Sequence, residues 1–201
     1  MKNEDKDAII QLYESRLKEI GENIKTLGWK DKEQQELRFS ILVDIGDLRG
    51  SKILDVGCGF GDLYDYLIRK GTNVRYTGFD ISSGMIEVAK KRHPDLTFEV
   101  RDILIDDIDD RFDFIFASGI LNKHISDNMT YAREIIKKMF DLCSIGTAIN
   151  MTTDYVDYKE DYLYYYSPEK IFKYCKTLSR YVTLRHDYPL YEFTAYIFKE
   201  K

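Results

Sequence analysis

The chain has 201 residues, 44% of them hydrophobic, which is enough for one substantial core and too few for two. A net charge of -5 without an isolated lysine and arginine block argues against nucleic acid as a partner. No apolar run is long enough to span a membrane, and Cys58, Cys143 and Cys175 fit neither a disulfide framework nor a metal site. We therefore expect one cytoplasmic domain without a bound metal.

The chain before residue 49 carries apolar residues at helical spacing within residues 9–20 and 37–48, which predicts two amphipathic helices. From Lys52 onward, short apolar runs alternate with helix-start signals, and this alternation predicts a parallel sheet with helices on both faces. The predicted strands are Lys52–Val56, Val74–Phe79, Thr97–Arg101, Phe112–Ala117 and Gly146–Met151, and the predicted helices between them are Asp62–Lys70, Ser82–Arg92 and Asp127–Leu142.

The end of the chain has a different pattern. A helix is predicted at Pro168–Leu178, followed by strands Tyr181–Arg185 and Phe193–Phe198, which a short turn around Pro189 connects. Two strands connected so closely pair antiparallel. The fold class is therefore α/β, a Rossmann-like, mostly parallel sheet, and we expect residues 1–48 to form a helical lid on a core of residues 49–201.

The run from Ile53 to Leu63 carries the most specific signal, an apolar strand that enters a glycine-rich turn and then a helix. Its glycine spacing is Gly-x-Gly-x-Gly, and Asp62 stands where a dinucleotide fingerprint needs its last glycine. Asp55 and Asp62 flank the turn, where they would repel a pyrophosphate and attract a cation. S-adenosyl-L-methionine carries a sulfonium and an ammonium and no phosphate, so the pattern favours this cofactor over NAD.

Two further acids follow later strands. Asp80 lies at the end of the second strand, about twenty residues beyond the glycine turn, where an acid reaches ribose hydroxyls; alternatively, it caps the next helix. Asp102, after the third strand, would accept a hydrogen bond from the adenine amino group, although this stretch is simply rich in acids. Ile103 lies beside Asp102, and Ile81 and Met85 would close over the adenine ring.

These motifs, together with the run from Phe112 to Gly119, resemble the ordered motif series of class I S-adenosylmethionine-dependent methyltransferases. The resemblance covers residues 48–151 and implies a seven-stranded sheet whose last strand inserts antiparallel beside the fifth. It also implies that the methionine end is held by Asp55, Gly57 and Gly59, with Cys58 as a small neighbour, and by Ser118 and Gly119; that Asp80 holds the ribose; and that Asp102 and Ile103 hold the adenine.

A looser similarity concerns residues 117–122 and 146–150. There the chain is similar to small methyltransferases from bacterial surface-polysaccharide and natural-product genes, which implies a sugar or another small molecule as acceptor. Methyl transfer to a hydroxyl needs a base, and His124, just after the fourth strand, is the candidate; a solvated loop histidine is the alternative. Asn122 and Asn150, at the ends of neighbouring strands, are candidate orienting groups.

The segment Tyr155–Tyr166 is dense in tyrosine and acid and follows the fifth strand. We expect it to form the acceptor side of the pocket, opposite the N-terminal helices, with a neutral or cationic acceptor group nearest to it. The predicted function is methyl transfer from S-adenosylmethionine to an oxygen or nitrogen of a small molecule. A nucleotide-dependent oxidoreductase or epimerase and a non-catalytic S-adenosylmethionine-binding module are the alternatives, and the oligomeric state is not indicated.

Overall fold

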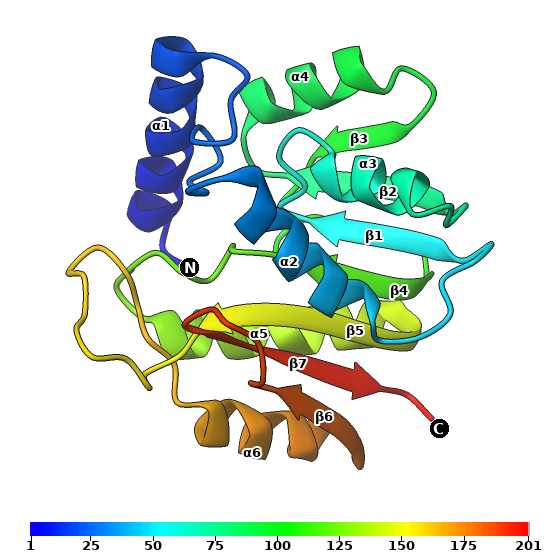
Figure 1. Cartoon of the computed structure of the whole chain (residues 1–201), viewed down its shortest axis with the longest axis vertical. Helices are drawn as coiled ribbons and strands as arrows, with labels where there is room; N and C mark the ends of the chain where they lie inside the picture. The colour runs from blue at the N-terminus through cyan, green and yellow to red at the C-terminus, as the bar shows by residue number, and fades with distance from the viewer. Residues whose placement is uncertain (201) are drawn as a thin grey trace.

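The computed structural model describes residues 1–200, in which seven strands form one sheet. The strands are β1 (Lys52–Val56), β2 (Arg75–Asp80), β3 (Thr97–Val100), β4 (Phe112–Ala117), β5 (Cys143–Thr152), β6 (Tyr181–Arg185) and β7 (Glu192–Phe198). The helices are α1 (Asn3–Ile20), α2 (Lys32–Val43), α3 (Asp62–Arg69), α4 (Ser83–Arg92), α5 (Asn128–Leu142) and α6 (Pro168–Leu178). Figure 1 shows them in place.

The strand order is β3-β2-β1-β4-β5-β7-β6. Strands β1 to β5 are parallel, β7 pairs antiparallel with β5, and β6 pairs antiparallel with β7. The predicted fold class is confirmed, including the last strand between β5 and β6. A parallel sheet that reverses its strand order between β1 and β4 opens a crevice at the carboxyl ends of these strands.

Helices cover both faces of the sheet, as predicted. One buried cluster joins side chains of α2, α3 and α4 to β1 through Ile53, and the other joins α5 and α6 to β1 through Leu54 and Val56. Alternate residues of a strand point to opposite faces, so a single buried strand serves both clusters. Figure 1 shows α2 and α3 in front of the sheet and α5 behind it.

The N-terminal helices are attached differently. Phe39 and Leu42 of α2 are buried in the same cluster as the sheet residue Phe114, so α2 belongs to the packed core. Helix α1 packs mainly against α4 and lies at the side of the molecule (Figure 1). The description of residues 1–48 as a lid therefore stays a prediction for α1 and for the connection between α1 and α2.

Side-chain caps begin four of the helices. Asp31, Ser82, Asp127 and Ser167 each accept a hydrogen bond from the backbone N–H three residues later, which satisfies a donor that the first helical turn leaves free. Because Ser82 caps α4, the interpretation of Asp80 as a cap is wrong. Among residues 1–200, no helix combines the length and the apolar character that a membrane crossing requires.

Candidate functional site

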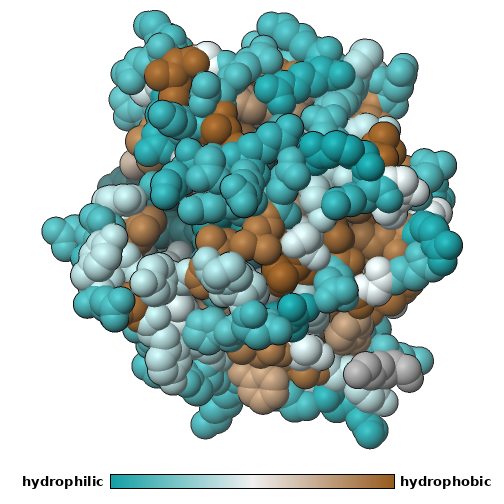
Figure 2. Space-filling model, in the orientation of Figure 1, coloured by the Kyte–Doolittle hydropathy of each residue, from teal (hydrophilic) through white to brown (hydrophobic). Residues whose placement is uncertain are grey.

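A cavity of about 580 Å³ opens at the carboxyl ends of the parallel strands. Its walls come from the ends of β1, β2 and β4, from both N-terminal helices and from the loop after β5. Figure 2 shows the surface recessed between α1 and this loop. All residues predicted to bind the cofactor line the cavity: Asp55, Gly57, Cys58, Gly59, Asp80, Ile81, Met85, Asp102, Ile103, Ser118 and Gly119.

The glycine turn after β1 forms the floor of the cavity. Gly57, Gly59 and Gly61 have φ angles of 73°, 54° and 85°, in the left-handed region that residues with a Cβ rarely adopt. A Cβ on Gly57 would lie 2.2 Å from the side chain of Ile120. Strand β2 fixes the turn in place, because the N–H groups of residues 57 and 58 both donate to the carbonyl of Phe79.

Asp80 is fixed against this turn. Its Oδ2 accepts from the N–H of Gly59 at 3.0 Å, and its Oδ1 accepts from the N–H of Ser82 at 2.9 Å. Burial raises the pKa of Asp80, and the backbone hydrogen bonds oppose the rise. The carboxylate therefore connects the glycine turn after β1 to the end of β2, and it also faces the cavity.

Asp55 lies deeper, at the end of β1, with 4% of its surface exposed. The hydroxyl of Tyr76 donates to its Oδ2 at 2.6 Å. Burial raises its pKa to about 7, against the opposing effect of the Tyr76 hydrogen bond, and the charges of Asp80 and Asp62 add to the rise. A cation bound beside Asp55 would favour its ionised form.

Asp62 lines the cavity, but its carboxylate is already paired and is less free to attract a cation than the sequence pattern suggested. Its carboxylate accepts from Gln35 at 2.9 Å and from Arg92 at 3.0 Å. Because Arg92 balances this charge, attraction of a cation to the turn depends on Asp55 and Asp80 instead.

The outer end of the cavity carries Asp102, Ile103, Ile81 and Met85. Asp102 forms an ion pair with Lys6 of α1 at 2.7 Å, so α1 is tied to the loop after β3. Tyr131, which no sequence motif indicated, also lies here. It lies near the start of α5, lines the cavity, and has a raised pKa because of burial and the charges of Asp102 and Asp80.

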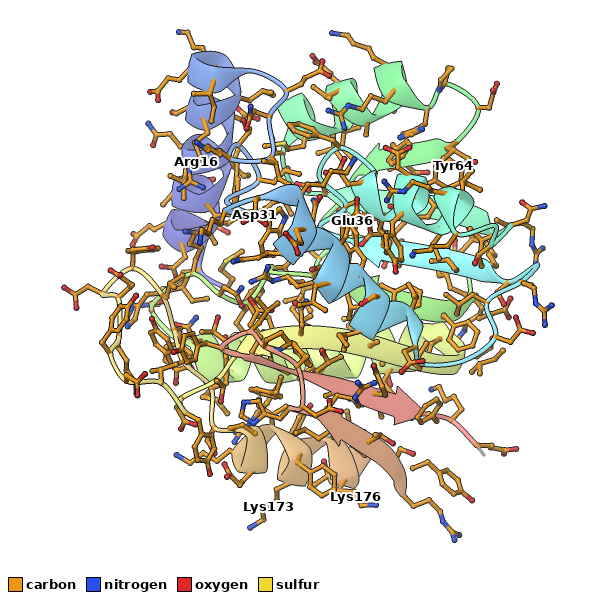
Figure 3. The ribbon with its side chains drawn as sticks, viewed as in Figure 1. Arg16, Asp31, Glu36, Tyr64, Lys173 and Lys176 are labelled. Carbon is orange, nitrogen blue, oxygen red and sulfur yellow. The ribbon has the colours of Figure 1, made fainter. Side chains whose placement is uncertain are left out.

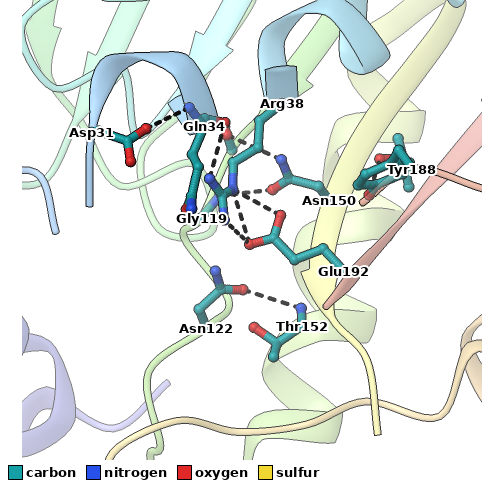
Figure 4. Close-up of polar contacts among 11 residues, drawn as sticks. Asp31, Gln34, Arg38, Gly119, Asn122, Asn150, Thr152, Tyr188 and Glu192 are labelled. Atoms are coloured by element: carbon teal, nitrogen blue, oxygen red, sulfur yellow. Dashed lines mark hydrogen bonds and ion pairs between the residues drawn. The ribbon is translucent and has the colours of Figure 1, made fainter. Parts of the chain in front are cut away.

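The end of β4 is supported from β5. Asn150, 1% exposed, accepts from the N–H of Gly119 at 2.9 Å and donates to the hydroxyl of Ser118 at 3.1 Å. Asn122 lines the cavity, and its side-chain oxygen accepts from the N–H of Thr152 at 3.3 Å. Figure 4 shows the contact of Asn150 with Gly119 and that of Asn122 with Thr152. The structure therefore places Asn122 at the cavity and Asn150 beneath its wall.

His124 is exposed and is not part of the cavity wall. Its N–H donates to the carbonyl of Tyr162, and its ring meets that of Tyr164. In this extended segment successive side chains point in opposite directions, so Lys123 lines the cavity while His124 faces outward. The position of His124 gives no support to its predicted role as a base.

Three cavity residues that the sequence analysis did not select form a group on the α2 side. Arg38 and Glu192 are a buried ion pair, and the indole of Trp29 lies 4.4 Å from the Arg38 guanidinium carbon. The tip of the Trp29 ring would lie 2.5 Å from a Cβ on Gly119. Residues 29, 38 and 192 are far apart in sequence, so no local motif could have indicated the group.

Comparison with known proteins is consistent with this geometry. Residues 53–145 match a family model described as a methyltransferase domain. Over 158 residues the chain is 37% identical to a protein of Mycobacterium tuberculosis that bears the name of a methyltransferase, and the match spans 73% of this chain and 92% of that protein.

Two solved structures share the fold. The first is magnesium protoporphyrin IX methyltransferase of Synechocystis PCC 6803 with bound S-adenosylhomocysteine, at a TM-score of 0.69 and 16% identity, covering 98% of this chain and 100% of that chain. The second is N-methyltransferase NodS of Bradyrhizobium japonicum in complex with S-adenosylhomocysteine, at 0.65 and 17%, covering 95% and 100%.

Proposed function

The chain belongs to the class I S-adenosylmethionine-dependent methyltransferases, and we propose that it methylates an oxygen or nitrogen of a small molecule bound in the cavity described above. The observation that carries the proposal is the cavity itself. It combines a positive-φ glycine turn, the buried carboxylate of Asp55 and the partly buried carboxylate of Asp80 with an open region walled by aromatic side chains.

The residues present fit S-adenosylmethionine. The glycine turn leaves its backbone accessible, because no Cβ stands between it and the cavity. Asp80 would accept hydrogen bonds from the ribose hydroxyls, and Asp55 and the residues around Ser118 would face the ammonium of the methionine end. Ile103, Met85 and Tyr131 line the end of the cavity that would hold the adenine.

The bound cofactor supplies an activated methyl group, and the chain provides position. Catalysis requires the acceptor atom to be held about 3 Å from the methyl carbon, opposite the sulfur. Asn122 lies at the cavity. Its side-chain oxygen accepts from Thr152, which leaves its NH₂ group to donate to an acceptor hydroxyl or amine and so orient it. Asn150 keeps the Ser118–Gly119 turn in place from behind.

Aromatic side chains form the acceptor end of the cavity. Tyr158, Tyr162, Tyr165 and Tyr191 all line it, and three of these, Tyr158, Tyr162 and Tyr191, are largely exposed. Tyrosine rings offer flat apolar faces with a polar edge, which suits stacking on a sugar or planar ring. Their position supports a ring-bearing small molecule as the acceptor.

The oxidoreductase alternative does not agree with the fold. A dinucleotide site requires a third glycine where Asp62 stands, and the antiparallel β7 between β5 and β6 replaces the all-parallel order of that class. A non-catalytic binding module would bind S-adenosylmethionine without turnover.

Binding and turnover together test the proposal. Titration calorimetry should show saturable binding of S-adenosylmethionine and S-adenosylhomocysteine and none of NAD. Asp80→Ala should weaken S-adenosylhomocysteine binding more than tenfold, since two or more charge-assisted hydrogen bonds are lost, whereas the exposed Asp109→Ala should leave it unchanged. A screen of sugars, nucleotide sugars and amines with radiolabelled methyl donor then identifies the acceptor. Tight cofactor binding with no labelled product would favour the binding module.

A further inference from the structure

Two cationic side chains without a counter-ion lie at one side of the cavity, Lys123 in its wall and Arg16 behind that wall. Lys123 lines the cavity, and its amine lies 4.8 Å from the centre of the Tyr162 ring. Arg16 of α1 lies behind Gly28, and its NH1 is buried and has no hydrogen-bond partner. Neither side chain forms an ion pair with any carboxylate of residues 1–200. Figure 3 labels Arg16 on α1.

The two charges act on each other. Burial lowers the pKa of Lys123, and the charge of Arg16 lowers it further. Two like charges that are partly removed from water and act on each other are costly unless an anion offsets them. The ammonium of Lys123 in the cavity wall, with the unpartnered guanidinium N–H of Arg16 behind Gly28, therefore favours negatively charged oxygens at this place.

We propose that Lys123 binds an anionic group of the acceptor, a carboxylate or a phosphate monoester, and that the positive charge of Arg16 behind the wall adds to the attraction. The inference rests on the proposed function in one respect, that the acceptor occupies this cavity. It adds the chemical class of the acceptor, which carries negative oxygens at the end near α1 and the loop after β4.

The backbone around Lys123 supports its assignment to the acceptor. Residues 122–124 pair with residues 162–164 through the bonds His124 N–H to Tyr162 carbonyl, at 3.1 Å, and Tyr164 N–H to Asn122 carbonyl, at 3.0 Å. Lys123 itself bridges Leu163. The lysine is thus part of the tyrosine-rich loop wall rather than of the glycine turn, where the cofactor would lie.

Acidic groups limit the size of the anion. Asp157 and Glu160 of the same loop line the cavity, and they would repel an extended polyphosphate. The earlier expectation of a neutral or cationic group next to this loop applies to the part near Asp157 and Glu160. The end near Lys123 has the opposite polarity, so the acceptor is expected to carry its single anionic group there.

The cofactor's own carboxylate is the second possible source of anionic oxygens, and the experiment separates the two. The protein is saturated with S-adenosylhomocysteine, and benzoate, phenyl phosphate and neutral benzamide are titrated as probes. Benzoate or phenyl phosphate should bind saturably and at least tenfold more tightly than benzamide. Whichever anion binds more tightly identifies the carboxylate or the phosphate arm.

Variants assign the preference to the two cations. Lys123→Gln should weaken binding of the preferred anion about tenfold or more, and Arg16→Gln should weaken it by a smaller factor, since its charge acts from behind the wall. Both variants should leave benzamide binding unchanged, while Lys123→Arg should keep the affinity within about threefold. The exposed Lys173→Gln on α6 (Figure 3) is the control. Melting temperatures verify that each variant is folded.

Each other outcome overturns the proposal. Equal binding of benzamide and benzoate, no saturable binding of either anion, or anion binding that both glutamine variants leave intact would show that the two cations do not select the acceptor. Loss of S-adenosylhomocysteine affinity in both variants, with anion binding unchanged, would assign the cations to the cofactor carboxylate. Failure of the wild-type protein to bind S-adenosylhomocysteine at all would instead contradict the proposed function.

Discussion

Arg38 of α2 and Glu192 at the start of β7 form a buried ion pair in which Nε and NH2 of the guanidinium donate to the carboxylate at 2.8 to 2.9 Å. The two residues are 154 positions apart and are 8% and 5% exposed. Figure 4 shows the pair between the two elements. The pair joins α2 to the last strand, so it closes the cavity on the α2 side.

Glu192→Gln should destabilise the protein by about 3 kcal/mol, because removal of one partner of a buried ion pair leaves the other charge uncompensated. Urea unfolding monitored by circular dichroism measures the loss. The matched control is Asp44→Asn, which removes the more exposed partner of Arg185, at 27% and 68% side-chain exposure, and should cost less than about 1 kcal/mol. Equal losses in both variants would contradict the assignment of Arg38 and Glu192 as a pair that stabilises the fold.

Asp55 should make the stability of the free protein depend on pH. Its pKa in the folded state is about 7, above the ordinary value of 3.8, so the folded state binds the proton more tightly than the unfolded state does. This contribution is fully present below about pH 4 and is lost as the pH rises to about 7, by roughly 4 kcal/mol in total. Asp55→Asn cannot ionise and should not show the loss.

The measurement is the difference in unfolding free energy between wild type and Asp55→Asn at pH 5 and at pH 8. The variant should gain stability relative to wild type at the higher pH. Binding of the cationic cofactor favours ionised Asp55, so wild-type affinity should also rise with pH through about 7. A difference that stays constant with pH would show that Asp55 has an ordinary pKa.

Gly57→Ala should impair both folding and binding. The residue has φ 73°, and a Cβ would lie 2.2 Å from Ile120 Cγ2. Gly71→Ala is the control, because Gly71 also has φ 73° but has no atom within 4 Å of the added carbon. The control should lose about 1 kcal/mol from backbone strain alone, whereas Gly57→Ala should lose more and bind S-adenosylhomocysteine over tenfold more weakly. Similar behaviour of the two variants would show that Ile120 accommodates the methyl group.

Most of the fold could be predicted from the sequence because the strands are short apolar runs separated by strong signals. Strands β1, β4 and β6 and helix α6 have the predicted bounds. Strand β5 begins three residues earlier than predicted, at Cys143, because the exposed Ser144 and Ile145 hide its start from a pattern of burial. The β-bulge between Phe112 and Phe114, where β4 pairs with β5, adds to the irregularity.

The candidate site was predictable only where it follows strand ends. The glycine turn, Asp80 and Asp102 lie at such ends, and the parallel sheet collects them. Arg38, Trp29 and Glu192 reach the cavity from elements whose arrangement no local pattern encodes. His124 was selected because it follows β4, and the one-residue alternation that directs Lys123 inward instead depends on pairing with the loop after β5.

His124→Ala should leave kcat and the acceptor KM within about threefold of wild type, since the side chain is exposed and outside the cavity wall. Asn122→Ala is the informative partner, because Asn122 lines the cavity, and its kcat should fall more. Steady-state kinetics with the first acceptor identified measures both. A large fall in kcat for His124→Ala with unchanged cofactor affinity would restore the histidine as the base.

The loop after β5 should act on the acceptor and not on the cofactor. Val156, Asp157, Tyr158 and Glu160 line the cavity, and the pairing of residues 122–124 with residues 162–164 lies beyond the segment to be removed. Replacement of residues 154–161 by a short Gly/Ser linker should therefore leave S-adenosylhomocysteine affinity within about threefold while it raises the acceptor KM at least tenfold or abolishes turnover. Calorimetry and steady-state kinetics on the same preparation separate the two effects. Lost cofactor binding with intact acceptor kinetics would mean that the loop covers the cofactor and that the two halves of the cavity are assigned in the wrong order.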